Sequence, residues 1–565
     1  MKKLVALLLV LAMSMSLFAG CKEEEKEPKV QETTEPTEEV TEPAPRVPLV
    51  PELGEDEDIL TFRYEQKYLD LYYEKLEQYE KAAMDGDLAA AEALQEDFEE
   101  LSYFIYDQTA IAQILSCCNT KDEEASDLLL EMTNILYDLS DVEILTMRRI
   151  YESDCAIKDE IFADWTEEEI DYMKHYTTEV RDIAKREEEI LVELREKEDE
   201  EKEEILGAYY CEIVTGHNRT AEIFGYENYY EYAYQSVRDR DYTAEEVKQL
   251  RAFAKEYCFV IYEKAFERFE KSYEELSYTN QRKLRELITG DYNDTDYLEE
   301  YLDALPEEMG QEMNGMLDGY SVFPKGAKAK EGAFTTVIGD HPFCYFSRGY
   351  KSPTTVAHEM GHYYAALYSD LMEIPLDIAE IHSQGNEWLM IAYSAEDLKE
   401  EVYQCYVDYK VANDMISILM AVIIDEFEER VYTAESVEDY ELKDFDKIME
   451  EVCEAYGGIK KLSEVVDIQD VWRSVAPEQA VYYISYAVSM VPSLDMFFCA
   501  DEDWDAAVEI YQKLTTGLDE DPTFLEVLEE VGLATPFEET VFKKLVERYE
   551  EPVEESTEEE AEKAA

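Results

Sequence analysis

The chain has 565 residues, of which 46% are hydrophobic and 12% aromatic, so most of it can bury a core and extensive disorder is excluded. Asp and Glu number 136 against 51 Lys and Arg, and the net charge of −85 would repel nucleic acid phosphates, so we expect no nucleic-acid partner. With only 20 Gly and 16 Pro, the composition favours a mainly α fold over a sandwich or barrel.

The first residues are typical of an export signal. A basic pair precedes an apolar run over residues 4–13 that is too short to span a membrane. Residues 17–21, Leu-Phe-Ala-Gly-Cys, resemble the cleavage box of bacterial lipoproteins, in which Cys21 is the lipid attachment site. We therefore expect a lipoprotein signal peptide at residues 1–20 and a lipid-anchored protein on the outer face of the bacterial cytoplasmic membrane. An ordinary secreted protein whose signal ends in cysteine is the alternative.

Two terminal segments are acidic and poor in aromatic residues. Residues 21–58 consist largely of Glu, Thr, Pro and Val, and cannot bury enough apolar surface to fold. Because their glutamates repel one another, we expect an extended, disordered tether. Residues 547–565 have a similar composition and are expected to form an acidic tail.

The cysteines do not suggest a disulfide framework. Nine of the 10 cysteines follow Cys21, which is an odd number, and no two of them form a C-x-x-C pair. Most, such as Cys258 and Cys344, have apolar neighbours and are expected to be buried thiols. No later stretch is long and apolar enough to cross a bilayer.

The body of the chain is patterned as helices. Over residues 59–207 apolar residues recur at spacings of three and four, which predicts an N-terminal helical region. Within it, residues 167–206 carry isolated apolar side chains on a charged background and are expected to form a long solvated helix or a helical hairpin. Residues 218–229 predict a helix that ends at Gly225 and restarts through Asn228.

The pattern changes near residue 335. Residues 335–338 and 343–346 are apolar and rich in β-branched and aromatic side chains, and the residues between them are typical of a turn. We therefore expect two short strands that form a hairpin. His341 lies in the predicted turn and is either a turn residue or a substrate contact. Helices are predicted again from Lys351 to the end.

One motif indicates a chemical function. Residues 358–362 read His-Glu-Met-Gly-His, and a Ser-Pro pair just before them supplies an N-cap and a first helical residue. His358 and His362 should therefore lie one turn apart on the same helix face, where two imidazoles can bind one zinc ion. Glu359 would lie beside the metal and could take a proton from a zinc-bound water whose pKa is lowered to about 7. Two surface histidines on a helix are the alternative.

A zinc hydrolase needs a third protein ligand and leaves the fourth position to water. Residues 375–388 are predicted to form a second helix after Pro375, with Asp377 as a candidate cap. Glu380 and Glu387 are seven residues apart and share a face of this helix. We expect Glu380 to be the third ligand, with Asp377 as the fallback, and Glu387 to orient a zinc-bound imidazole.

These segments resemble the M3 metallopeptidases, the group of thimet oligopeptidase and oligoendopeptidase F. The His-Glu-Met-Gly-His motif matches the zinc helix of that family, and residues 378–384 with Glu387 are similar to its ligand segment. The first glutamate of that segment, here Glu380, binds zinc in the family. Residues 218–229 and the predicted hairpin are similar as well.

The resemblance implies a fold and a substrate class. It implies a two-lobed helical zincin with a deep substrate channel and a small hairpin or sheet beside the active site. The catalytic domain would occupy residues 208–546, and the edge of the hairpin would pair with the backbone of a short peptide substrate. The chain would then be a zinc endopeptidase, expected to act as a monomer.

Two features depart from the family. The interval from His362 to Glu380 is shorter than usual. The tyrosine-rich segment at residues 477–487 lacks the histidine that donates a hydrogen bond to the tetrahedral oxyanion in the family. By the resemblance, Tyr486 and either Tyr483 or Tyr482 would donate instead, and the loss of one such donor costs roughly 10²- to 10³-fold in rate.

Two other functions stay open at the level of sequence. A peptide-binding surface lipoprotein with a degenerate, poorly active site would keep the channel without turnover. A zinc peptidase of another family would share the motif and its chemistry but not the channel.

Overall fold

The computed structural model describes residues 48–51, 53, 58–197, 199–238, 240–294, 296–326, 328–369, 374–458, 468–518 and 522–550. The predicted signal peptide, Cys21 and most of the predicted tether lie outside these residues, as does the tail beyond residue 550. No helix in the described ranges has both the length and the apolar character that a membrane span requires.

Helices follow one another through the N-terminal region, as the apolar spacing predicted. They are α2 (Gln66–Asp85), α3 (Leu88–Cys118), α4 (Glu123–Glu152), α5 (Lys158–Ile161), α6 (Glu167–His175), α7 (Thr178–Glu196) and α8 (Asp199–Ile223). The side chains of Asp87 and Asp122 accept hydrogen bonds from the first turns of α3 and α4 and so begin these helices. Because α7 packs against α8, residues 167–206 contain a helical hairpin and not one long helix.

The predicted helix break after α8 is confirmed. Gly225 has a φ of 88°, a conformation that glycine adopts without a steric cost, and Asn228 caps α9 (Tyr229–Tyr232). The helices that follow are η1 (Ala233–Val237), α10 (Ala244–Phe253), η2 (Ala254–Cys258), α11 (Phe259–Glu275), α12 (Tyr278–Thr289), η3 (Tyr292–Asp294), α13 (Tyr297–Ala304) and α14 (Glu307–Gly315).

A small sheet interrupts the helices, and its hairpin was predicted. Strands β2 (Ala333–Ile338) and β3 (His341–Phe346) pair antiparallel, with Thr335 opposite Cys344. A third strand, β1 (Ser321–Val322), pairs parallel to β3, so the order is β1-β3-β2. Two residues are too few to give a strand pattern, which is why β1 was not predicted. His341 is the exposed first residue of β3, so its assignment to the turn was wrong.

The C-terminal helices complete the fold. They are α15 (Pro353–Ala366), α16 (Leu376–Asp397), α17 (Glu400–Tyr432), α18 (Leu442–Glu454), α20 (Ile468–Glu478), α21 (Ile484–Glu502), α22 (Trp504–Thr516), α23 (Phe524–Val531) and α24 (Thr540–Glu550). Most side chains of α16 and α17 are buried, and α16 packs on both α15 and α21. The chain is mainly helical, as predicted.

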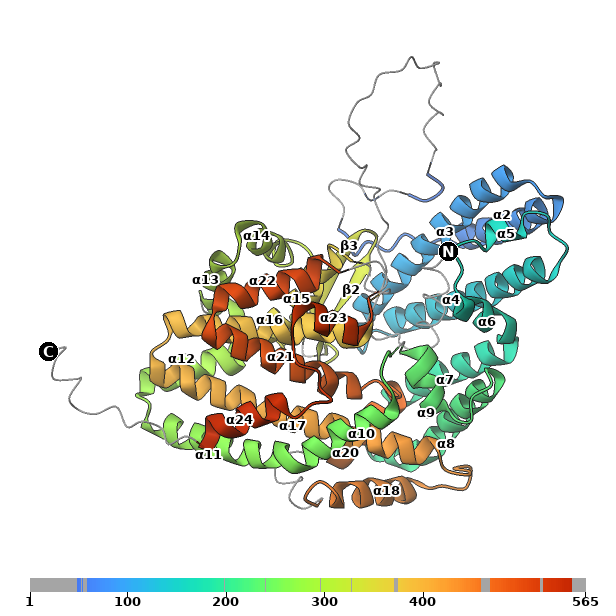
Figure 1. Cartoon of the computed structure of the whole chain (residues 1–565). Coiled ribbons are helices and arrows are strands. Elements are labelled where there is room, and N and C mark those ends of the chain that lie inside the picture. Colours follow the sequence, from blue (N-terminus) through green and yellow to red (C-terminus); the bar gives the residue numbers. More distant parts are fainter. Residues whose placement is uncertain are drawn as a thin grey trace, which may run out of the picture.

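The sheet lies between the N-terminal helices and the helices of the C-terminal half. Figure 1 shows α2 to α7 on one side of the molecule and α11 to α17 with α21 to α24 on the other. Strand β2 packs against both α3 and α15, so the hairpin is held between the N-terminal helices and the helix that carries the His-Glu-Met-Gly-His motif.

The cysteines of the described ranges are free thiols, as the sequence predicted. Cys258 and Cys344 are completely buried, and burial raises the pKa of both thiols. Because the thiolate is the reactive form, both side chains are expected to be inert.

A buried carboxyl group in the N-terminal region makes stability depend on pH. Glu143 of α4 is 4% exposed and accepts a hydrogen bond from the Tyr72 hydroxyl at 2.7 Å. Burial raises the pKa of Glu143 from 4.5 to about 8. In the unfolded chain the pKa keeps its ordinary value, so the stability that this group contributes is present below about pH 4.5 and is lost as the pH rises through 8.

We expect the Glu143→Gln variant to escape this loss, because its amide stays neutral and can still accept from Tyr72. Between about pH 5 and pH 9, the difference in unfolding free energy between variant and wild type should move by about 2–4 kcal/mol in favour of the variant. Urea unfolding at several pH values measures this difference. The same substitution at Glu131, which is exposed on α4, is the control, and equal pH profiles for all three proteins would contradict the prediction.

Candidate metal centre

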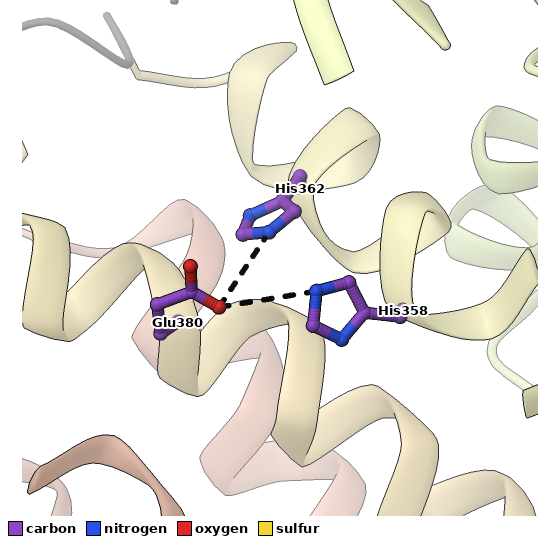
Figure 2. Close-up of side chains that lie close together, drawn as sticks. All are labelled: His358, His362 and Glu380. Atoms are coloured by element: carbon purple, nitrogen blue, oxygen red, sulfur yellow. Dashed lines mark ion pairs between the residues drawn. The ribbon is translucent and has the colours of Figure 1, made fainter. Parts of the chain in front are cut away.

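Helices α15 and α16 bring three potential metal ligands together (Figure 2). The Glu380 Oε2 atom lies 3.8 Å from His358 Nε2 and 3.9 Å from His362 Nε2. The three ligand atoms lie within 4.8 Å of one another. Tetrahedral zinc with bonds of about 2.0–2.2 Å separates its ligand atoms by about 3.3–3.6 Å. The separations from Glu380 Oε2 exceed this spacing by about 0.2–0.6 Å, so small side-chain movements would let the two imidazole nitrogens and the carboxylate oxygen bind one zinc ion.

Local sequence signals begin both helices. The Ser352 hydroxyl accepts a hydrogen bond from the Thr355 N–H at 3.2 Å, and Pro353 occupies the first turn of α15, as predicted. Pro375 is the N-cap of α16, so this helix also begins where the sequence indicated. Although the interval between His362 and Glu380 is short, Glu380 approaches both imidazoles. Residues 370–373 of that interval lie outside the described residues.

Close contact between the two helices depends on a glycine inside the motif. A Cβ atom at Gly361 would lie 2.3 Å from the backbone oxygen of His382, which is far too close for any side chain. The glycine therefore lets α15 approach the backbone of α16 at the level of the ligands. Nearby, the Asn386 side chain donates a hydrogen bond to the Ala357 carbonyl at 2.6 Å and ties the helices together.

Glu387 lies beside His358, the position that we expected for a group that orients an imidazole. Its Oε1 atom is 2.7 Å from His358 Nδ1, which leaves Nε2 directed towards Glu380. Burial opposes the positive charge of His358, but the bond to Glu387 and the neighbouring carboxylates outweigh it and raise the pKa of His358 to about 9. Burial alone would raise the pKa of Glu387, but Lys410 and His358 hold it below its usual value.

Sequence reasoning missed the buried ion pair behind Glu387. The Lys410 ammonium group lies 3.3 Å from Glu387 Oε2 and donates to the Asp414 carboxylate one turn further along α17. The Trp388 indole donates to the other oxygen of Asp414 at 3.0 Å. All four side chains are largely buried, so the ion pair fixes Glu387 and, through it, His358. A Lys and an Asp four residues apart within an apolar stretch of helix were the signal that could have revealed it.

The Glu359 carboxyl group lies on the hairpin side of the ligands. Glu359 is 4% exposed, and its Oε2 atom accepts a hydrogen bond from the Thr335 hydroxyl of β2 at 2.8 Å. Burial raises the pKa of Glu359, and it also raises the pKa of Glu380 to about 7. Burial lowers the pKa of His362 well below its ordinary value, so this imidazole is neutral. A neutral imidazole is the form that binds a metal, so zinc binding at His358, whose pKa is raised, has to release a proton, whereas His362 has none to lose.

The predicted tyrosines cluster at the start of α21. The Tyr482 hydroxyl donates to Glu380 Oε1 at 3.2 Å, a contact that the sequence did not indicate. The ring centre of Tyr486 lies 5.6 Å from that of Tyr482 and 5.2 Å from that of Tyr483. Burial raises the pKa of all three phenols, so each stays protonated and able to donate a hydrogen bond.

Asp377 does not join the ligands, and its two predicted roles were wrong. It is 1% exposed, and it accepts a hydrogen bond from the Tyr242 hydroxyl at 2.7 Å. The Arg240 Nε atom is 3.7 Å from the same carboxylate oxygen. The group of described side chains that could hold a metal ion comprises His358, His362 and Glu380 and does not include Asp377. Asp377 also makes no capping hydrogen bond, because Pro375 is the N-cap of α16.

The remaining histidines also lie elsewhere. His382 is buried, with its Nε2 atom 3.1 Å from the Leu514 carbonyl. His217 is buried between the Tyr432 hydroxyl and the Glu187 carboxylate, and His175 is exposed at the end of α6.

Comparison with known proteins settles the fold. No protein-family profile matches the chain, and neither does any curated protein sequence. Solved structures do match most of it. PZ peptidase A with an inhibitor has a TM-score of 0.62 at 18% identity, over 87% of this chain and 98% of that one. A candidate oligoendopeptidase F from Bacillus anthracis has a TM-score of 0.61 at 16% identity, over 88% and 97%.

A third structure is oligoendopeptidase F from Enterococcus faecium, with a TM-score of 0.52 at 15% identity over 86% of this chain and 96% of that one. The chain has the oligoendopeptidase F fold. The helical architecture and the small sheet that the sequence resemblance implied are therefore confirmed. At these identities the likeness concerns the fold alone.

Proposed function

We propose that the protein is a zinc endopeptidase that hydrolyses short peptides. The observation that carries this proposal is the convergence of His358 and His362 of α15 with Glu380 of α16, and Glu359 follows His358 directly in α15. The shared fold supports it, because the similar solved structures carry the names peptidase and oligoendopeptidase. A zinc ion in this site would lower the pKa of a water molecule and polarise the scissile carbonyl group.

Glu359 is the proposed general base. It would take the proton from the attacking water and pass it to the leaving amine, so that no covalent intermediate forms with the protein. Its burial raises its pKa, which makes the carboxylate a better proton acceptor than an exposed glutamate. The hydrogen bond from Thr335 fixes one carboxylate oxygen and leaves the other available.

The tyrosines are the proposed donors to the oxyanion of the tetrahedral intermediate. Tyr486 and Tyr483 keep their protons, and no histidine is present in this segment to share the task. Tyr482 already donates to Glu380, so its proposed contribution is to the ligand carboxylate. With fewer donors than its family resemblance implies, the enzyme is expected to turn over slowly.

The proposed setting is outside the cytoplasm. A lipid on Cys21 would anchor the chain to the outer face of the cytoplasmic membrane, and residues 21–58 would hold the folded body away from the bilayer. The substrates would be short peptides that reach a channel beside the hairpin. We propose a monomer.

Digestion of a mixed peptide library tests this function. We expect the purified chain with zinc to cleave internal bonds of short peptides, and a chelator such as 1,10-phenanthroline to stop cleavage until zinc is added back. Sequencing the products gives the preference around the cut. A protein that binds zinc and peptides but cleaves none would support the alternative, a peptide-binding lipoprotein with a degenerate site.

A further inference from the structure

The turn that precedes α21 contains a strained residue. Val481 has a φ of 54°, and no other non-glycine residue in the described ranges has a positive φ. In this region the Cβ atom of an L-residue crowds its own backbone, and a β-branched side chain makes the crowding worse. Such a conformation costs free energy and persists only where the surroundings impose it. The neighbours of Val481 should therefore show what holds it.

The buried side chains of Glu428 and Arg240 hold both peptide groups of Val481. Its N–H donates to Glu428 Oε1 at 2.8 Å, and its carbonyl accepts from Arg240 Nη2 at 3.0 Å. The same Arg240 nitrogen donates to the Ser485 hydroxyl at 3.0 Å, in the first turn of α21. Glu428 and the side chain of Arg240 are both 0% exposed. The hydrogen bond from the buried Arg240 guanidinium is charge-assisted and therefore among the stronger ones in proteins, so this arrangement can impose the strained conformation.

A second arginine holds the residues on either side. Arg238 Nη2 donates to the Ala480 carbonyl at 3.0 Å, and the guanidinium carbon lies 5.1 Å from the centre of the Tyr482 ring. The Tyr482 hydroxyl in turn donates to Glu380 Oε1. A continuous set of contacts therefore runs from the strained residue to a proposed metal ligand.

We propose that Arg238, Arg240 and Glu428 are positioning residues that hold the strained turn so that the Tyr482 hydroxyl stays on Glu380. The physical reason is that a ligating carboxylate is oriented and tuned by the groups that hydrogen bond to it, and losing such a group costs about 10- to 100-fold in metal affinity or activity. This inference rests on the proposed function, because it takes Glu380 as a metal ligand.

A double-mutant cycle on zinc affinity tests the proposal. The dissociation constant of zinc is measured by competition with a chromophoric chelator for wild type, Arg240→Met, Tyr482→Phe and the double variant. If Arg240 acts through Tyr482, each single variant binds zinc about 10-fold more weakly and the double variant is no weaker than either. A double variant that loses about 100-fold would show independent effects and overturn the proposal. So would Arg240→Met with wild-type affinity.

A variant at a second, partly buried arginine controls for the loss of an arginine that pairs with a buried group. Arg268 of α11 donates to the Asp408 carboxylate and lies 4.5 Å from the centre of the Tyr549 ring, much as Arg240 lies 4.5 Å from that of Tyr234. Arg268→Met should lower the unfolding temperature and leave zinc affinity within about twofold of wild type. If Arg240→Met does not fold, Arg238→Met, which removes the hydrogen bond to the Ala480 carbonyl, takes its place in the cycle with the same expected losses.

The cycle also separates this proposal from the proposed function. Zinc affinity is measured without peptide, and peptide hydrolysis is measured on the same preparations. A wild-type protein that binds zinc and cleaves nothing would contradict the endopeptidase, while the coupling between Arg240 and Tyr482 would still decide whether the turn positions Glu380.

Discussion

Glu359→Gln is expected to lower kcat for peptide hydrolysis by about 10²- to 10⁴-fold while one zinc ion stays bound per chain. The amide has nearly the same shape as the carboxylate and can still accept the hydrogen bond from Thr335, but it cannot take a proton from water. His358, His362 and Glu380 are unchanged, so the ion should stay. Hydrolysis of a quenched fluorescent peptide and zinc analysis of the same sample measure the two quantities.

Glu396, which is exposed near the end of α16, provides the control for this experiment. Glu396→Gln should match the wild type in both rate and zinc content, because its side chain lies outside the site. If Glu359→Gln keeps wild-type activity, Glu359 is not the base. If it loses zinc as well as activity, its effect is on the metal site and the assignment as base fails.

Glu380→Ala is expected to weaken zinc binding by more than about 100-fold, so that the purified variant contains almost no metal and no peptidase activity. Losing a group that only supports a ligand costs about 10- to 100-fold in metal affinity. The loss of a ligand itself should therefore exceed about 100-fold. In this variant two imidazoles would be left to hold the ion. Titration with zinc in the presence of a competing chelator measures the affinity directly.

The zinc affinity of Glu387→Gln is the comparison for that of Glu380→Ala. Glu387 contacts His358 and not the proposed ion, so its loss should fall within the 10- to 100-fold range. If Glu380 is a ligand and Glu387 only orients one, Glu380→Ala should lose more zinc affinity than Glu387→Gln. Retention of wild-type zinc affinity by Glu380→Ala would place the third ligand at another residue.

The convergence of the three candidate ligands could be predicted from sequence because its signals are local. A Ser-Pro start fixes the beginning of α15 and a proline fixes that of α16, so the faces that carry His358, His362 and Glu380 follow from helical periodicity. The hairpin was recognisable for the same reason, since β-branched and aromatic residues flank a short turn.

The parts that failed or were missed depend on contacts between distant segments. Asp377 is close to the ligands in sequence, but Tyr242, which lies 135 residues earlier, takes its carboxylate. Lys410 and Asp414 would be ordinary exposed charges on a solvated helix, and only the packing of α17 makes them support Glu387. Tyr482, which contacts Glu380, directly follows a valine with a positive φ, and no spacing rule predicts that conformation for a valine.

The location of bound zinc tests the account most directly. Anomalous diffraction recorded on both sides of the zinc absorption edge, from crystals of the purified wild-type protein grown with zinc, locates the ion without any assumption about activity. We predict one anomalous peak per chain, within bonding distance of His358 Nε2, His362 Nε2 and a Glu380 oxygen, with one coordination position left to solvent. A zinc-supplied protein with no peak at these three side chains would contradict the proposed metal centre and the hydrolysis that depends on it.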